Sequence, residues 1–197
     1  MKLILKIMIL LGGLAPLCSR VAGQQYQLRE GHIRFSIIAP ASELTADNDS
    51  LSGSLDLGKG TLRITAYVAG FAFTSAEMPE LMRKGATYRF HHYYFDSERY
   101  PLATFNGAAA ALKKIDPAKD GTYEISCEGK LSMHDVIKII TVKGTVTMKS
   151  GIATLNSDFM IDPHDYAVRI PETISRFYYK DMKIAVKARM VRKGAKQ

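Results

Sequence analysis

The sequence predicts an all-β protein, in which eight antiparallel strands close into a barrel and one short helical insertion lies around residues 77–97. Three observations support this fold class. Apolar and polar residues alternate with period two in eight segments. Turn-forming residues separate these segments, at 47–49, 58–60, 119–121 and 150–151. No segment is long enough to form the helices that would otherwise cover a sheet.

The alternating segments, in chain order, are residues 33–37, 51–57, 62–68, 103–107, 123–129, 140–148, 155–161 and 182–190. Successive side chains of a strand point to opposite faces, so each segment has one apolar and one polar face. This pattern is typical of antiparallel sheets covered on one side. Curling into a barrel buries the apolar faces and pairs every strand, whereas a two-sheet sandwich is the alternative.

One segment interrupts the strands. The run SAEMPELMRKG contains helix-compatible residues, and Pro79 is well placed for a first helical turn. The following RFHHYYFDSER could form a second short turn. We find neither repeat nor linker in the rest of the chain, so we expect a single domain.

The predicted inward face mixes bulky, small and flexible residues. Its bulky members are Phe35, Phe71, Phe73, Phe105 and Phe159, its small ones are Gly107, Ala109 and Ala111 on one predicted strand, and its flexible ones are Met133, Met148, Met182 and Met190. An eight-stranded barrel is just wide enough to be filled by side chains or to hold one small ligand. Composition alone leaves both interpretations open.

The N-terminus resembles a secretory signal peptide. Lys2 and Lys6 precede an apolar run over residues 3–17, and the small residues at 21–23 suit cleavage after Gly23. The run is too short for a comfortable transmembrane span. We therefore expect residues 1–23 to be removed and residues 24–197 to form the domain, periplasmic or secreted. Lipid attachment at Cys18 is the less favoured alternative, because no small residue precedes it.

The mature chain would contain one cysteine and a modest positive charge. Cys127 lies in an alternating segment and is expected to be a buried, inert thiol. Loss of the three basic residues of the signal lowers the net charge from +8 to +5. Basic residues gather in the last eleven positions, but without the aromatic interleaving or phosphate loop of a nucleic-acid site. We expect a solvated last strand and no nucleic-acid partner.

The stretch YYFDSERYPLATFNG, residues 93–107, resembles the YceI-like family of exported bacterial proteins. Two further stretches agree with it, residues 31–64 and the hairpin YEISCEGKLSMHDVIKIITVKGTV over 123–146. The chain departs from the family pattern in two places. Close relatives often carry a His where this chain has Arg89, and an Asn-Glu-Asn run where it has His91, His92 and Tyr93. The family has Gly where this chain has Asp135. The resemblance implies a lipocalin-like barrel with an apolar channel that binds polyisoprenoids or fatty-acid-like amphiphiles, without enzymatic activity or cofactor.

The motif FHHYYFDSERYP raises the question of a metal site. His91 and His92 are adjacent, so they point in different directions whether the segment is a strand or a helix, and they are poor partners for one ion. Ser97 lies near His91, His92 and Asp96 but lacks a nucleophile elbow, so we expect no catalytic residues. We interpret the segment as a lid, with aromatic side chains over the barrel mouth and His91, His92 and Asp96 toward water. An aromatic plug without a ligand is the alternative.

These expectations combine into one prediction: an exported, non-enzymatic protein that sequesters or carries a long apolar lipid, with a structural or interaction module as the alternative. The expected cavity or lid residues are Phe35, Ile37, Ile64, Val68, Phe71, Phe90, Tyr94, Phe95, Phe105, Ile125, Leu131, Val142, Val146 and Phe159. Arg89 and His134 are candidates for a polar mouth, and no metal or cofactor is expected. The sequence leaves the oligomeric state open, a homodimer included.

Overall fold

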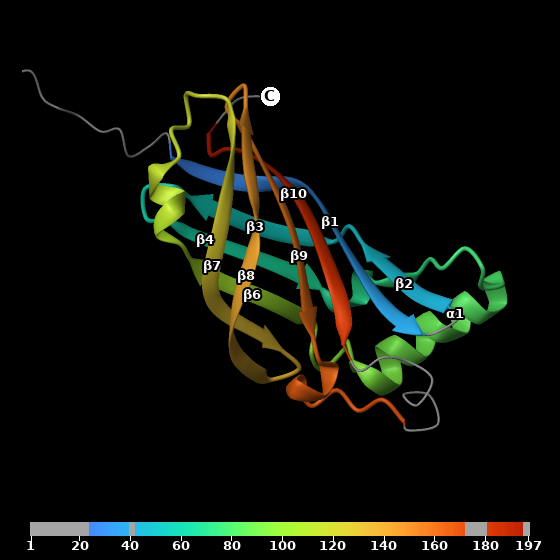
Figure 1. The fold of residues 1–197 in the computed structure, drawn as a ribbon. Coiled ribbons are helices and arrows are strands. Elements are labelled where there is room, and N and C mark those ends of the chain that lie inside the picture. Colours follow the sequence, from blue (N-terminus) through green and yellow to red (C-terminus); the bar gives the residue numbers. More distant parts are fainter. Residues whose placement is uncertain (1–23, 40–41, 172–180, 195–197) are drawn as a thin grey trace, which may run out of the picture.

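The computed structural model of the protein describes residues 24–39, 42–171 and 181–194, and most of these residues lie in strands (Figure 1). The predicted signal peptide therefore lies outside the described residues. The strands are β1 (Gln25–Ala39), β2 (Ser42–Asn48), β3 (Leu51–Asp56), β4 (Thr61–Tyr67), β5 (Ala72–Phe73), β6 (Leu102–Ala108), β7 (Gly121–Met133), β8 (Val136–Lys149), β9 (Ile152–Ile161) and β10 (Met182–Arg192).

Eight of these strands form a closed antiparallel barrel. Around the barrel the order is β1, β3, β4, β6, β7, β8, β9 and β10, and β10 pairs back with β1 from Ile37↔Met182 to Tyr26↔Arg192. Each of the eight alternating segments of the sequence forms one of these strands. The predicted fold class is therefore confirmed, and the sandwich alternative is not what the chain adopts.

Strands β2 and β5 lie outside the barrel. β1 is long enough to pair with β3 over Gln25–Gln27 and with β2 from Ile33 onward. β2 then pairs with β5, and helix α1 (Glu80–Arg89) packs beside β5. These elements form an extension at one side of the barrel (Figure 1). Neither strand was predicted from the sequence.

A charged pair holds β2 against β1 on the outer surface. The Arg34 guanidinium donates two hydrogen bonds to the Asp47 carboxylate, at 2.7 and 2.9 Å, and the Thr74 hydroxyl donates a third at 2.6 Å. The hydrogen bond from Arg34 lowers the pKa of Asp47, although partial burial acts in the opposite direction. Hydrogen bonds to a carboxylate favour its charged form, so this contact is strongest while Asp47 is ionised.

Two hairpins of the barrel turn within two residues. His134 and Asp135 join β7 to β8 with φ values of 52° and 61°, and Ser150 and Gly151 join β8 to β9 with φ values of 49° and 75°. Turns with two positive φ values match the twist of the strands that they join. Asp135 adopts the left-handed conformation that Gly would adopt at lower cost.

The helical insertion is confirmed and consists of α1 followed without a break by the π-helix η2 (Phe90–Tyr94). Two shorter 3₁₀ helices, η1 (Val68–Gly70) and η4 (Pro163–Tyr166), join strands. Within the described ranges, no helix is both long and apolar enough to cross a membrane.

A further 3₁₀ helix, η3 (Ala110–Lys114), corrects one prediction. Gly107, Ala109 and Ala111 were expected on one face of a strand, but β6 ends at Ala108. The alanine-rich run has a high helix propensity, and the turn places Leu112 in the core with none of its surface exposed. η3 therefore closes one end of the barrel instead of lining its wall.

Candidate functional site

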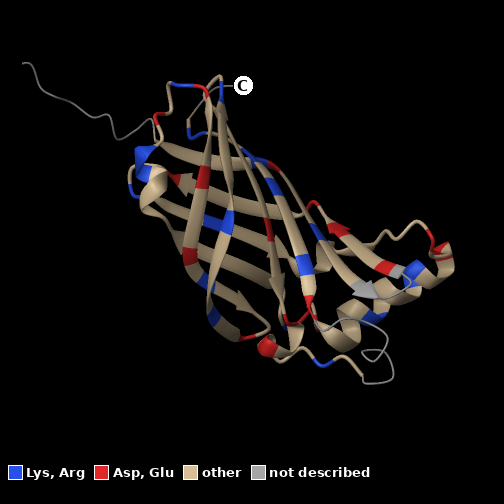
Figure 2. Cartoon of the chain, in the orientation of Figure 1, with Lys and Arg blue, Asp and Glu red and all other residues tan. Residues whose placement is uncertain are grey.

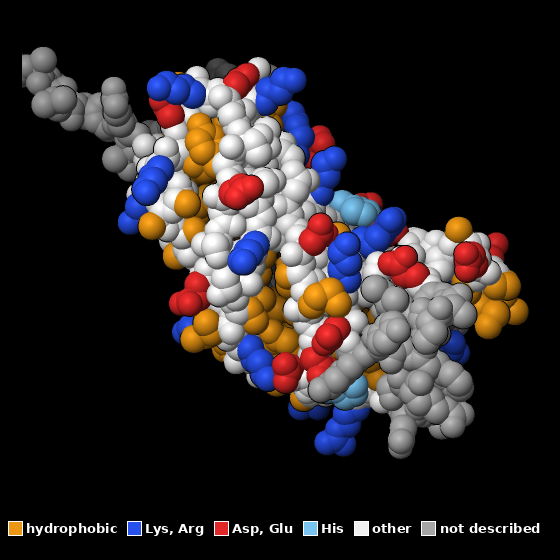
Figure 3. Space-filling model, in the orientation of Figure 1, with side chains coloured by type: hydrophobic (Ala, Val, Ile, Leu, Met, Phe, Trp, Pro, Cys, Tyr) orange, Lys and Arg blue, Asp and Glu red, His pale blue; other side chains and the backbone are white. Residues whose placement is uncertain are grey.

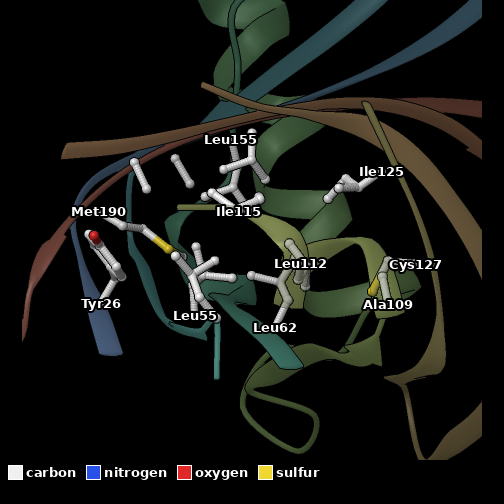
Figure 4. Packing of buried hydrophobic residues seen from close by; sticks show 14 of the residues in the cluster. Tyr26, Leu55, Leu62, Ala109, Leu112, Ile115, Ile125, Cys127, Leu155 and Met190 are labelled. Carbon is white, nitrogen blue, oxygen red and sulfur yellow. The ribbon is translucent and has the colours of Figure 1, made fainter. Parts of the chain in front are cut away.

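One half of the barrel interior is solid. Tyr26, Leu55, Leu112, Met148 and Met190 are almost completely buried and belong to a single packed cluster. Figure 4 shows Tyr26, Met190, Leu55 and Leu112 side by side in this cluster. A close-packed cluster of this kind contributes stability but leaves no room for a ligand. We call these five residues, with Val146, Ala153 and η3, the packed end.

The other half contains an apolar cavity. Its volume is about 130 Å³. An apolar cavity of about 150 Å³ can stay dry and bind benzene. The interior is therefore hollow at this point, on the scale of a small apolar ligand.

The lining of the cavity is almost entirely apolar. It comprises Ile33, Phe35, Leu62, Ile64, Ala66, Val68, Phe71, Phe90, Phe95, Ala103, Phe105, Ile125, Cys127, Leu131, Met133, Val142, Gly144, Thr145, Leu155, Asn156, Ser157, Phe159, Ile161, Met182, Ile184, Val186 and Ala188. No charged side chain is among these residues. Charged residues are spread along the strands and loops, with both signs interspersed (Figure 2). Such a cavity recognises hydrocarbon and offers no partner for a buried charge.

Aromatic side chains close the end of the cavity opposite the packed end. Phe90 stacks on Phe95 with 4.3 Å between ring centroids, and on Phe35 at 5.4 Å. Phe71 and Phe73 contact the same rings. We call these five residues the aromatic cover. It is contributed by β1, by the segment around β5 and by the helical insertion, so the insertion does lie over the barrel interior.

The π-helix changes which aromatic residues are neighbours. With α-helical spacing, Phe90 would have Tyr94 as its neighbour on the same face. In η2 the Phe95 N–H donates to the Phe90 carbonyl at 2.9 Å, a bond to the fifth preceding residue. Phe90 and Phe95 therefore stack, and both are buried, whereas Tyr94 is half-buried beside them. The extra residue in the turn brings a second phenyl ring over the cavity.

The histidines of the insertion differ in environment. His92 is exposed and lies against the Tyr88 ring, as expected for a water-facing residue. His91 was also expected to face water, but it is half-buried, and its Nε2 donates to the Phe71 carbonyl at 2.8 Å. This bond ties the insertion to the segment that precedes β5. Among the described residues, no three His, Cys, Asp or Glu side chains are grouped so that they could hold a metal ion.

Most of the predicted site residues share the cavity. Eleven of the fourteen line it: Phe35, Ile64, Val68, Phe71, Phe90, Phe95, Phe105, Ile125, Leu131, Val142 and Phe159. Ile37 and Tyr94 pack against the neighbouring core cluster, and Val146 is fully buried at the packed end. Of the two polar candidates, Arg89 has an exposed side chain on α1, and His134 lies in the β7–β8 turn against the Tyr100 ring.

The structure adds lining residues that the prediction omitted. Ile33, Leu62, Leu155, Ile161 and Ile184 have the same inward phase as predicted neighbours, so the alternation itself could have identified them. Thr145, Asn156 and Ser157 have no comparable signal in the sequence. They are the polar part of the lining, and all three lie where β8 meets β9.

The single cysteine of the described chain lies in the cavity wall. Cys127 is 1% exposed, and burial raises the pKa of its thiol. Because the thiolate is the reactive form, the raised pKa and the burial both suppress reactivity. Cys127 therefore acts as a small apolar residue of the lining.

A closed β-barrel with an apolar interior cavity, covered at one end by a helical insertion, defines the class of small barrels that enclose a ligand-sized space. The sequence model of the YceI-like domain matches residues 26–190, and the chain belongs to this family. No curated protein matches the sequence.

Solved structures with the same fold are distant in sequence. A polyisoprenoid-binding domain from Saccharophagus degradans superimposes with a TM-score of 0.70 at 15% identity, over 88% of this chain and 99% of the other. BcnA from Burkholderia cenocepacia gives a TM-score of 0.65 at 17% identity, over 81% of this chain and 95% of the other. At such identities the likeness supports the fold alone.

Proposed function

We propose that this protein binds one long apolar lipid, a polyisoprenoid or a fatty-acid-like chain, in the barrel cavity and performs no chemistry on it. The observation that carries the proposal is the uncharged lining of the cavity. Membership of the YceI-like family and a distant polyisoprenoid-binding structural relative agree with it. The N-terminal 23 residues support export, so the lipid would be held in the periplasm or outside the cell.

Burial of hydrocarbon supplies the affinity. Sequestering roughly 400 Å² of a lipid chain contributes about 10 kcal/mol before the cost of ordering the chain is subtracted. The interior space of about 130 Å³ is small for a long chain. Met133 and Met182 line the cavity, and their unbranched side chains can change rotamer to make room.

The test uses mature protein from which lipids have been removed. A fluorescent fatty acid and a fluorescent isoprenoid are titrated separately, and native mass spectrometry of protein purified from its host identifies any bound molecule. We expect saturable binding of one lipid per chain. Absence of binding for both probes, with the fold intact by circular dichroism, would refute the proposal and favour the alternative of a structural or interaction module.

A further inference from the structure

The β8–β9 ladder covers only part of either strand. It runs from Lys149↔Ile152 to Gly144↔Ser157 and then stops. Beyond this point, residues 136–143 of β8 pair with β7, and residues 158–161 of β9 pair with β10. The two strands separate visibly toward the bottom of Figure 1. We call the space between residues 136–143 and 158–161 the slit.

Two residues at the upper end of the slit account for its position. A Cβ atom on Gly144 would lie 2.4 Å from the Asn156 carbonyl oxygen, so only glycine fits at the last pair of the ladder, Gly144↔Ser157. The Ser157 hydroxyl donates to the Lys143 carbonyl at 2.7 Å. A side chain thus satisfies this carbonyl where the backbone ladder ends.

The slit is continuous with the cavity. Val142 and Phe159 have the inward phase on the two sides of the slit, and both line the cavity. Thr145 and Asn156 have the outward phase, yet they line it too, so the cavity reaches through the barrel wall here. Figure 3 shows apolar side chains exposed in a hollow between these strands.

The outer rim of the slit is unusually apolar. Ile137 of β8 is 62% exposed, and Met160 of β9 is 52% exposed. Apolar residues grouped around an opening often mark a binding groove. At the lower end, Lys138 of β8 forms an ion pair of 2.7 Å with Asp165 of η4. Both side chains are substantially exposed, and such a pair contributes little to stability and opens readily.

Among the described residues, the two ends of the barrel offer no comparable route. η3 and the packed end close one of them, and the aromatic cover closes the other. We propose that the slit is a lateral portal, through which the hydrocarbon tail of the lipid enters the cavity between Val142 and Phe159. This inference rests on the proposed function, because it specifies the route to the same cavity.

The test locks the slit with a covalent link. Continuation of the β8–β9 register would place Thr141 opposite Met160, both with the outward phase, so the pair T141C/M160C can be joined by a short, cleavable, thiol-specific cross-linker. The matched control is T147C/T154C, a pair within the existing ladder. Both variants carry C127A, so that only the introduced thiols react. Rates of uptake and release of a fluorescent fatty acid are measured by stopped flow, before and after cleavage of the link.

We expect the link across the slit to slow uptake and release by at least about ten-fold, with the rates restored on cleavage, because a closed gate retards both directions. Complete loss of uptake that returns on cleavage would support the portal equally. The control link should leave both rates unchanged. Unchanged rates in the fully cross-linked slit variant would overturn the portal while leaving lipid binding intact. Absence of binding even in the unlinked proteins would instead refute the proposed function.

Discussion

Replacement of Ala66 by Leu tests whether the interior is hollow, because the sign of the stability change differs between a hollow and a solid core. Ala66 lies in β4, is 4% exposed and lines the cavity. Leucine adds three carbon atoms, each worth about 0.8 kcal/mol when buried, so filling empty space should stabilise the lipid-free protein by about 2 kcal/mol. For a chain of this size that raises Tm by about 4–8 °C.

The same substitution should weaken lipid binding. The leucine side chain occupies space that about three methylene groups of the ligand would otherwise fill, which lowers the affinity by roughly 30-fold. Differential scanning calorimetry of lipid-free protein and titration with a fluorescent fatty acid measure the two effects. An increase in stability together with a loss of affinity is the combination expected of a ligand-sized void.

Ala153 provides the matched control. It lies in β9 with the same inward phase, but it is fully buried in the packed end and does not line the cavity. Ala153→Leu should therefore destabilise the protein by about 1–3 kcal/mol, as overpacking does in solid cores. If Ala66→Leu destabilised the lipid-free protein to the same extent, the reasoning from a hollow interior would be wrong.

Three further predictions concern single residues. Asp135→Gly should stabilise the protein by about 0.5–1 kcal/mol in urea unfolding, because glycine adopts the left-handed turn conformation without steric cost; a loss of stability would contradict this. Folding lowers the pKa of Asp47, so its contribution to stability is present above about pH 4 and lost as the pH falls further. Asp47→Asn should accordingly make the free energy of unfolding less dependent on pH below about pH 4. An unchanged pH dependence would argue against the contact with Arg34. Cys127 should resist thiol reagents at pH 8 in the folded protein and react fully in denaturant; rapid labelling of the folded state would show that the wall is open there.

The barrel could be predicted from the sequence because its physical signal is local and repeated. Each of its eight strands keeps an apolar inward face, as in residues 182–190, and the structure pairs all of them into one ring. β2 was missed because its sequence, SELTADN, is mostly polar and shows no regular alternation. It lies outside the ring, so neither of its faces has to be apolar to line the barrel interior. β5 is two residues long and carries no periodic signal at all.

The cavity was only partly predictable, since alternation identifies inward residues but not empty space between them. Val146 and Val142 have the same phase on β8, yet one is packed and the other lines the cavity. The π-helix had no recognisable signature, so the sequence could predict Phe90, Tyr94 and Phe95 as lid residues but not that Phe95 is the one that stacks on Phe90. The slit could not be predicted either. The alternation of apolar and polar residues in β8 is the same on both sides of Gly144, although β8 pairs with β9 on only one side.

Closure of the barrel between β1 and β10 joins the two strands that are furthest apart along the chain, as in the pair Ile33↔Val186. Contacts of such long sequence separation slow folding, because the chain loses much entropy before they form. Until β10 is in place, β1 and β9 each present a free row of backbone donors and acceptors to other molecules. Pairing of β10 with β1 and β9 therefore removes the two free strand edges at which a newly made chain could aggregate.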